Sequence, residues 1–342
     1  MCIRDRFEVY KPSGGFGLST IIYFLLGLVA TALLAVAYAF GLRFIPFIYI
    51  SFIMTGVFSL ALGFLGATIV TKGHCRSVLL AALIGTLLCG FGVIAKHYVQ
   101  YEVWVGEVTD AQIAYEISEG ELPRDQSEDV RNKVREEVRD WVRGEVSFLS
   151  RFKIRADEGI VIGKGNGAPI TGVFMYLLWA VELGIVLFLG WMAPIIAAKK
   201  PYNEKLGMWA DETEEAMRLP ISSDEMVGQI KSATTVEELL EIPIPKDIDN
   251  RRYALYDVHS VAGEELEDAY LSVSLFVKSV DKDGELKLHE TKLVHNAILT
   301  SAQRGQLLEN ASLMQEALDA YRDALAAEEQ SEYEDEVDEG EV

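Results

Sequence analysis

The stretch ITGVFMYLLWAVELGIVLFLGWMAPIIAA, Ile170 to Ala198, is an apolar run interrupted by a single acidic residue, Glu182. A bilayer core requires roughly 20 consecutive apolar residues in a helix, because unpaired backbone groups cannot be left in hydrocarbon. The stretch therefore predicts a transmembrane helix. Glu182 lies about 12 residues into it, so at about 1.5 Å per residue its carboxyl group is expected roughly 18 Å along the helix, near the bilayer midplane.

An acid at that depth costs several kcal/mol unless it is protonated or paired, and it is a candidate for function. We expect no cation opposite Glu182, because Lys96 stands at the outer end of another apolar run and would have to reach too far inward. The side chain is then expected to be protonated and hydrogen-bonded to a hydroxyl, or to face a second copy of the chain. The candidate hydroxyls are those of Thr31, Thr55, Ser59 and Thr86. Structural stabilisation is favoured over a proton or cation path, since no internal repeat or broken helix is evident.

Three further apolar runs, Leu18 to Gly41, Phe44 to Val70 and Ser77 to Ala95, give four predicted spans with residues 170–198. Basic residues of short loops mark the cytoplasmic side. The topology residues are Lys72, Arg76, Lys199 and Lys200. They predict that both termini are cytoplasmic and that residues 96–169 are extracytoplasmic. In an alternative interpretation, a signal-peptidase-like site around Ala35 to Ala39 leads to cleavage of the first span, which leaves three.

Small side chains at four-residue spacing predict where the spans pack, because helices in lipid associate through close approach. One row lies on the second span and another on the third. The very short connection at residues 72–76 predicts that these two spans are antiparallel neighbours. The packing residues are Ser59, Gly63 and Ala67 on the second span and Ala81, Gly85 and Cys89 on the third.

The extracytoplasmic segment, residues 96–169, predicts two amphipathic helices. One carries a valine stripe from Val130 to Val146, with Asp125 or Ser127 as the N-cap, and a shorter one closes at Gly120. We expect these two helices to pack on each other; the alternatives are that the stripe binds a partner or lies on the lipid surface. The glycine-rich run at residues 163–172 lacks the pattern of a phosphate-binding loop, so it predicts a linker.

Residues 199–327 predict a cytoplasmic α+β domain. A partly helical lead-in at 201–215 is followed by two short helices, capped by Ser222 or Ser223 and by Thr234 or Thr235. Alternation of apolar and polar residues over 251–261, 271–280 and 285–299 predicts about three antiparallel strands with a turn at 281–284. A helix from Ser301 is expected to cover the sheet through a stripe of apolar residues. The stripe comprises Leu307, Ala311, Met314, Leu318, Tyr321 and Leu325.

Charge is segregated along the chain. Residues 199–342 hold 14 Lys and Arg against 34 Asp and Glu, which accounts for −20 of the total −21. Nine acids and no base follow from Glu328 onward, and this composition predicts a disordered acidic tail over 328–342. A segment of this charge is repelled by nucleic acid and by an anionic membrane surface, so neither is expected to bind it.

No catalytic, cofactor or metal site is predicted. Cys75 and Cys89 form no CxxC motif, and the pair His74-Cys75 lacks further ligands at a suitable spacing. His259, His289 and His295 belong to no known catalytic spacing. We therefore expect a non-enzymatic protein without a cofactor.

The first six residues, MCIRDR, match the translation of a common transposase-based sequencing adapter, and we interpret residues 1–6 as an adapter artefact. Residues 7–17 are then a cytoplasmic N-terminal segment. The text GLRFIPFIYISF, a glycine-spaced second span and a short basic loop resemble uncharacterised bacterial multi-pass inner-membrane proteins with a cytoplasmic α+β domain. The resemblance covers mainly residues 7–105. It implies a bacterial cytoplasmic membrane and no activity.

The sequence thus predicts an α-helical membrane protein of four transmembrane helices in residues 18–95 and 170–198, with a small outer helical segment and a cytoplasmic α+β domain. The function it favours is an integral membrane anchor that presents the acidic domain to a protein partner, with the outer helices as a second contact or sensing element. The alternative is a small oligomeric transporter or channel that uses Glu182. The expected partners are the lipid bilayer and a protein, and homo-oligomerisation is left open.

Overall fold

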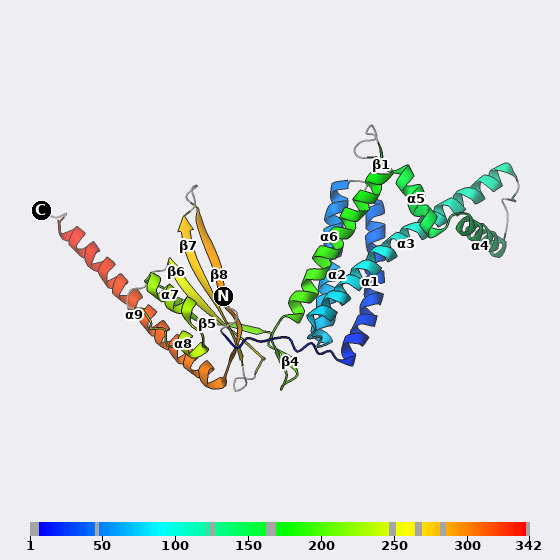
Figure 1. The fold of residues 1–342 in the computed structure, drawn as a ribbon. Helices are drawn as coiled ribbons and strands as arrows, with labels where there is room; N and C mark the ends of the chain where they lie inside the picture. The colour runs from blue at the N-terminus through cyan, green and yellow to red at the C-terminus, as the bar shows by residue number, and fades with distance from the viewer. Residues whose placement is uncertain are drawn as a thin grey trace. The chain divides into compact units, whose positions relative to one another are not determined.

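A computed structural model describes residues 7–44, 48–120, 122–123, 127–161, 169–245, 251–263, 269–280 and 285–339 (Figure 1). The chain divides into two compact units. The helical unit is residues 13–199, and the sheet unit combines residues up to 12 with those from 200 onward. Several sequence predictions fall outside the described residues. They concern residues 1–6, Asp125, most of the glycine-rich run at 163–172 and the turn at 281–284.

The helical unit contains four helices that are long and apolar enough to cross a membrane. They are α1 (Leu18–Phe44), α2 (Ile48–Lys72), α3 (Val78–Glu119) and α6 (Val173–Ala198). Large apolar side chains such as Leu26, Phe64 and Phe174 remain exposed on them, as lipid-facing residues do. The prediction of four helices long and apolar enough to span a membrane is confirmed, and their length and composition are those of a multi-pass membrane protein.

Both rows of small residues pack against α6. A Cβ atom added at Gly63 of α2 would lie 3.1 Å from the backbone oxygen of Leu189, and one at Gly85 of α3 would lie 3.3 Å from Cγ of Pro194. On α6 itself, a Cβ at Gly190 would overlap the sulfur of Cys89. The two rows therefore let α6 approach both helices closely, and α2 and α3 also contact each other. The sequence located these two faces, but it did not identify α6 as their common partner.

The third helix does not end at Ala95, where the apolar run ends. α3 continues without interruption to Glu119 and closes on Gly120, which adopts the left-handed conformation with φ of 81°. The helix end at Gly120 was predicted. The prediction of a separate short helix before Gly120 was wrong, because these residues continue α3. Residues 96–119 contain no proline, so nothing in the backbone ends the helix that the apolar segment begins.

Two helices follow on the same side of the helical unit. α4 (Glu128–Glu145) begins after Ser127 and packs on α3, where Val142 is buried with Tyr101 and Val105. The predicted packing of the outer helices is thus confirmed for one end of the valine stripe, whereas Val130 at the other end is 48% exposed. α5 (Phe148–Glu158), capped by Ser147, was not predicted. A short antiparallel pair, β1 (Ile160–Val161) and β2 (Pro169–Ile170), leads into α6.

The sheet unit contains a four-stranded antiparallel sheet in the order β5-β6-β7-β8. The strands are β5 (Glu212–Pro220), β6 (Arg252–Ser260), β7 (Ala269–Val280) and β8 (Leu286–Leu299). The last three strands were predicted. The partly helical lead-in was wrong, because residues 202–203 and 208–209 form a small hairpin, β3–β4, and β5 follows it. β5 was missed because its first residues, Glu212 to Glu215, are mostly acidic and show no alternation of apolar and polar residues. Their side chains are exposed, although the strand pairs with β6.

Three helices cover one face of the sheet. α7 (Asp224–Ser232) is capped by Ser223 and α8 (Val236–Leu240) by Thr235, as predicted. Alternate residues of β6, namely Ala254, Tyr256 and Val258, join the same buried core as Leu307 and Met314 of α9 (Ser301–Glu339). The prediction that this helix covers its own sheet is therefore confirmed.

α9 differs from the prediction at its far end. The helix runs to Glu339, where a disordered tail was expected from residue 328. No glycine or proline occurs between Gly305 and Gly340, and glutamate and alanine favour helix, which explains the continuation. At the start of β8, the predicted alternation also fails to produce burial, because Leu286 and Leu288 are 76% and 52% exposed.

Residues preceding the first span complete the sheet unit. Val9 bridges Ala297 of β8, the amide of Tyr10 donates to the carbonyl of Asn296 at 2.8 Å, and the amide of Ile298 donates to the carbonyl of Glu8 at 2.9 Å. Phe7 is only 8% exposed and belongs to the main core of this unit. Residues 7–12 and the domain after α6 are therefore parts of one folded body.

Candidate functional site

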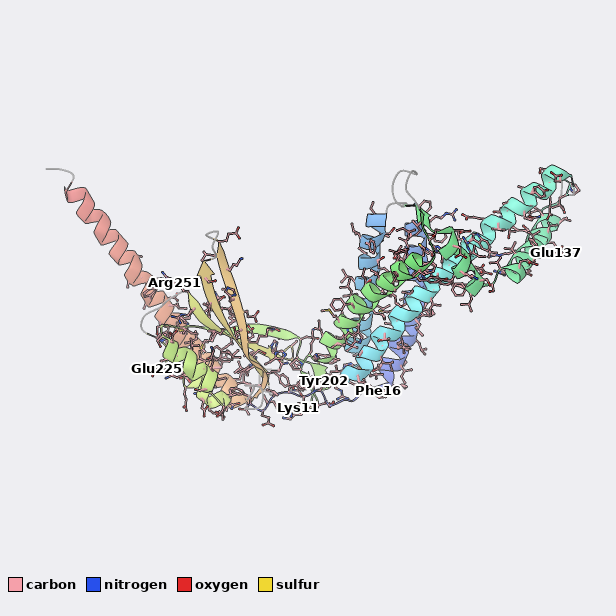
Figure 2. All side chains as sticks on the ribbon, turned by 45° about the horizontal axis from the view of Figure 1, so that its top comes forward. Lys11, Phe16, Glu137, Tyr202, Glu225 and Arg251 are labelled. Carbon is pink, nitrogen blue, oxygen red and sulfur yellow. The ribbon has the colours of Figure 1, made fainter. Side chains whose placement is uncertain are left out.

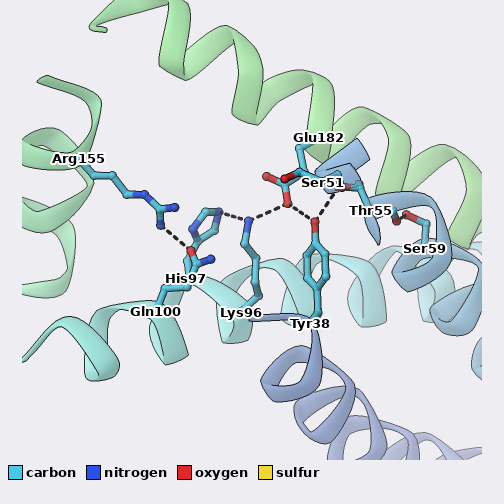
Figure 3. Close-up of polar contacts among 9 residues, drawn as sticks. All are labelled: Tyr38, Ser51, Thr55, Ser59, Lys96, His97, Gln100, Arg155 and Glu182. Atoms are coloured by element: carbon cyan, nitrogen blue, oxygen red, sulfur yellow. Dashed lines mark hydrogen bonds and ion pairs between the residues drawn. The ribbon is translucent and has the colours of Figure 1, made fainter. Parts of the chain in front are cut away.

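Polar residues from the four apolar helices converge on Glu182 of α6 (Figure 3). The ammonium of Lys96, on α3, lies 2.7 Å from Oε1 of Glu182, and the two side chains are 3% and 14% exposed. The hydroxyl of Tyr38, on α1, donates to the same carboxylate oxygen at 2.9 Å. We call Tyr38, Thr55, Lys96, His97 and Glu182 the polar cluster. It contains one buried ion pair and residues from all four spanning helices.

The pairing of Lys96 with Glu182 corrects the expectation that no cation lies opposite the acid. α3 and α6 are antiparallel, since Cys89 lies against the carbonyl of Val186 at 3.5 Å and Gly85 lies against Gly190. Continuing this register places Lys96 level with about residue 179, roughly 4.5 Å along the axis from Glu182. A lysine stem spans that distance easily. The expectation failed because the depth of each residue was counted from the end of its own span, without the register between α3 and α6.

Tyr38 connects the ion pair to α2. Its hydroxyl lies 2.7 Å from that of Thr55, which in turn donates to the carbonyl of Ser51 at 2.9 Å. Among the predicted hydroxyls, Thr55 therefore reaches Glu182 only through the hydroxyl of Tyr38. The other three predicted hydroxyls are not hydrogen-bonded to Tyr38 or Glu182 among the described contacts. Ser59 donates to the carbonyl of Thr55, Thr86 is exposed and bonds its own helix, and Thr31 is buried with no partner in the described part of the chain.

Tyr38 was missed as a site residue, although a signal existed. A phenol inside an apolar helix carries a hydroxyl that requires a hydrogen-bond partner. Its ring also stacks on Phe58 of α2 with centroids 4.5 Å apart. The side chain thus has an apolar contact and a polar contact at the same depth.

One end of the cluster is closed by α5. The ring of His97 lies next to Lys96, with Nε2 3.4 Å from the ammonium, and its centroid is 4.8 Å from that of Phe152 and 5.9 Å from that of Trp179. Arg155 of α5 donates to Oε1 of Gln100 at 2.5 Å, just beyond His97 on α3. The unpredicted helix α5 therefore contacts the third span at the level of the ion pair.

The other end of the cluster is closed by apolar side chains. Phe58, Leu62 and Val186 are buried in the next layer, followed by Ile69 and Leu88 in another. Among the described residues, the polar contacts of Glu182 do not extend through these layers. The arrangement can neutralise two charges and hold four helices in register, and among the described residues its hydrogen bonds and ion pair form no chain across the unit.

The remaining predicted residues lie at the ends of the spans. Lys72 ends α2, Lys199 caps the C-terminus of α6, and Lys200 pairs with Asp211 at 2.9 Å. Arg76 follows the turn after α2, and its amide donates to the carbonyl of Gly15 at 2.9 Å. The structure thus places these four basic residues near helix termini and away from the polar cluster.

Histidine and cysteine form no site in the described residues. His259 contacts the hydroxyls of Thr213 and Ser272 at 2.9 Å and 3.2 Å. Burial lowers the pKa of His259 most, and the nearby charges of Lys200 and Lys292 lower it further. Cys75 and Cys89 are free and buried. Within the described ranges, no group of three or more metal-binding side chains is found.

Comparison of the chain with protein-family models, with curated proteins and with solved structures gave no match.

Proposed function

We propose that this chain is a non-enzymatic membrane anchor that presents its acidic α+β domain to a protein partner. The observation that carries the proposal is the closed polar cluster. A charge-neutral ion pair that is followed by apolar layers on one side suits a structural lock, whereas a transport pathway needs polar groups that continue to both membrane surfaces.

The sheet unit supplies the surface for the partner. One face of the sheet packs on α7, α8 and α9, and the opposite face carries Asp257, with Glu215 across one strand pair and Ser272 across the other. The pKa of Asp257 is raised, first by burial and then by the nearby carboxylates of Glu215 and Glu290, which together outweigh the opposing effect of the Lys292 ammonium. A basic side chain of a partner would relieve this repulsion, which favours a partner with a basic surface.

The orientation we infer places both termini in the bacterial cytoplasm and α4 and α5 outside. Basic residues at the ends of α2 and α6 favour it. Residues 8–10 pair with β8, which supports placing both termini on the same side of the membrane. Four crossings agree with this placement, because an even number of spans returns the chain to the side on which it began.

The transport alternative predicts a measurable flux through the protein. In liposomes containing the full chain and a pH-sensitive dye, we expect proton leakage no faster than in protein-free liposomes, because apolar layers close the polar cluster. Glu182→Gln is expected to behave like the wild type. A flux shown by the wild type and lost in Glu182→Gln would replace the anchor with a transporter or channel.

Partner binding is tested in intact cells with the full chain, since Phe7 completes the core of the sheet unit. A photo-crosslinking amino acid replaces Lys292, which is exposed and pairs with Ser274 on the strand beside the one that carries Asp257. The matched control carries it at Gln315, exposed on α9. We expect a crosslinked protein adduct from position 292 and none from 315. Absence of an adduct at 292, or equal adducts at both positions, would contradict the proposed surface.

A further inference from the structure

The helix α4, Glu128 to Glu145, contains a four-residue repeat that the proposed function does not use. The stretch VRNKVREEVRDWVRGE, residues 130–145, places valine followed by arginine at every fourth position. Residues four apart lie on one side of a helix, so α4 carries an apolar row with a basic row beside it. The valines are Val130, Val134, Val138 and Val142, and the arginines are Arg131, Arg135, Arg139 and Arg143.

The apolar row makes only a short contact with α3. At about 3.6 residues per turn, a four-residue repeat advances by about 40° beyond a full turn at each step, so the row rotates by about 120° between Val142 and Val130. Burial along α4 agrees with this rotation. Val142 is 3% exposed and packs with Tyr101 and Val105 of α3, whereas Val130 is 48% exposed. Apolar packing therefore holds α4 mainly at its Val142 end.

At that end, two arginines of the basic row share one acid of α3. Arg139 and Arg143 both donate to Oε2 of Glu102 at 2.7 Å. Arg143 also lies 3.6 Å from Asp140 of its own helix. The side chain of Glu102 is 20% exposed, so this carboxylate is partly shielded from water. One acid of α3 thus binds two successive steps of the arginine row.

The ion pairs continue along α4 where the valines turn away from α3. Arg135 pairs with Asp110, which lies about two helical turns beyond Glu102 on α3. The two side chains are 57% and 56% exposed, so water and salt reach this pair. An exposed ion pair changes an equilibrium by a factor of roughly 1.4 to 5, and salt weakens it. We call these five paired residues the ionic latch, and they are Glu102, Asp110, Arg135, Arg139 and Arg143.

We propose that α4 is an arm held on α3 by the ionic latch, and that a rise in ionic strength releases its Val130 end from α3. The Debye length falls from about 30 Å at about 0.01 M salt to about 3 Å at about 1 M, where exposed charges no longer attract one another. The short apolar contact at Val142 then remains as the attachment. α4 is followed directly by α5, whose Phe152 ring contacts His97, so movement of the arm has a route to the polar cluster. The inference does not depend on the protein partner proposed above.

The distance between two spin labels tests the proposal on the full chain in nanodiscs of zwitterionic phosphatidylcholine, measured by double electron–electron resonance. Cysteines that carry the labels replace Tyr115 of α3 and Asn132 of α4, in a chain with Cys2→Ser. Both positions are exposed and uncharged, so labelling removes no charge. Between about 0.01 M and about 1 M sodium chloride, we expect the ratio of long to short distances to rise about tenfold, the combined effect of three exposed ion pairs.

Glu102→Gln removes the carboxylate that two arginines share and keeps the shape of the side chain. This variant is expected to show the long distance already at low salt and to change less with salt than the wild type. The matched control is Glu137→Gln, which removes an exposed carboxylate of α4 and should match the wild type.

A charge exchange separates the ionic latch from a general effect on folding. Asp110→Arg places like charges together and should favour the long distance, and the double variant Asp110→Arg, Arg135→Asp should restore the short one. The same distance in the wild type at both salt concentrations would overturn the proposal. Failure of the double variant to restore the short distance, or a short distance in Glu102→Gln equal to that in Glu137→Gln, would overturn it as well.

Discussion

Replacing Lys96 with methionine is expected to lower the free energy of unfolding of the helical unit by roughly 3–5 kcal/mol, because Glu182 is left as an uncompensated charge among buried side chains. Unfolding of the full chain by a denaturing detergent in mixed micelles, followed by circular dichroism, measures the change. The methionine has nearly the length of the lysine stem, so the loss reports the charge and not a cavity.

Removing both partners provides the control for this prediction. In the double variant Lys96→Met, Glu182→Leu, no buried charge remains, and we expect stability within about 1–2 kcal/mol of the wild type. Thr86→Val, which removes an exposed hydroxyl of the same helix, is expected to have almost no effect. If Lys96→Met and Thr86→Val were equally stable, the ion pair would not hold the helices together.

The second large effect is expected at Phe7, in the core of the sheet unit. Phe7→Ala should destabilise the sheet unit by about 3–5 kcal/mol, because the side chain is 8% exposed in its core and truncation leaves a cavity. Hydrogen exchange of the full chain provides the measurement. The amide of Ile298, which donates to the carbonyl of Glu8, should lose protection first.

The neighbouring residue provides the matched control. The side chain of Glu8 is exposed, and only its backbone carbonyl pairs with β8, so Glu8→Ala should leave exchange at Ile298 nearly unchanged. Equal protection of Ile298 in the wild type and in Phe7→Ala would mean that the segment before α1 is not part of the folded sheet unit.

The features that the sequence predicted well depend on local patterns. Apolar runs of sufficient length predicted four spans, and alternation of apolar and polar residues predicted β6, β7 and most of β8. Cap residues Ser223 and Thr235 predicted the starts of two short helices, because their side chains accept backbone N–H groups at the first turn. In these cases the information lies within a few residues of the element.

The features that were missed depend on distant residues. Lys96 and Glu182 are 86 positions apart, and only the register between α3 and α6 shows that they meet. The pairing of Val9 with Ala297 has no local signal, because its two residues lie near opposite ends of the chain. No pattern within residues 7–10 shows that they join the core of the sheet unit. α5 was overlooked because the valine stripe ended at Val146 and no helix was assigned to the residues after it, although Ser147 accepts the amide of Ser150 and begins a new helix.

The central claim is that the chain crosses the membrane four times, with α4 on one side and the sheet unit on the other. Single cysteines replace Glu137 of α4 or Glu225 of α7, which are exposed in their own units (Figure 2), in a chain whose Cys2 is changed to serine. Cys75 and Cys89 are buried and should contribute little background. The decisive measurement is labelling by a membrane-impermeant maleimide in intact bacterial cells. We predict labelling at position 137 from the medium and labelling at position 225 only after the membrane is opened. Labelling of both positions from the medium, or of position 225 alone, would contradict the account.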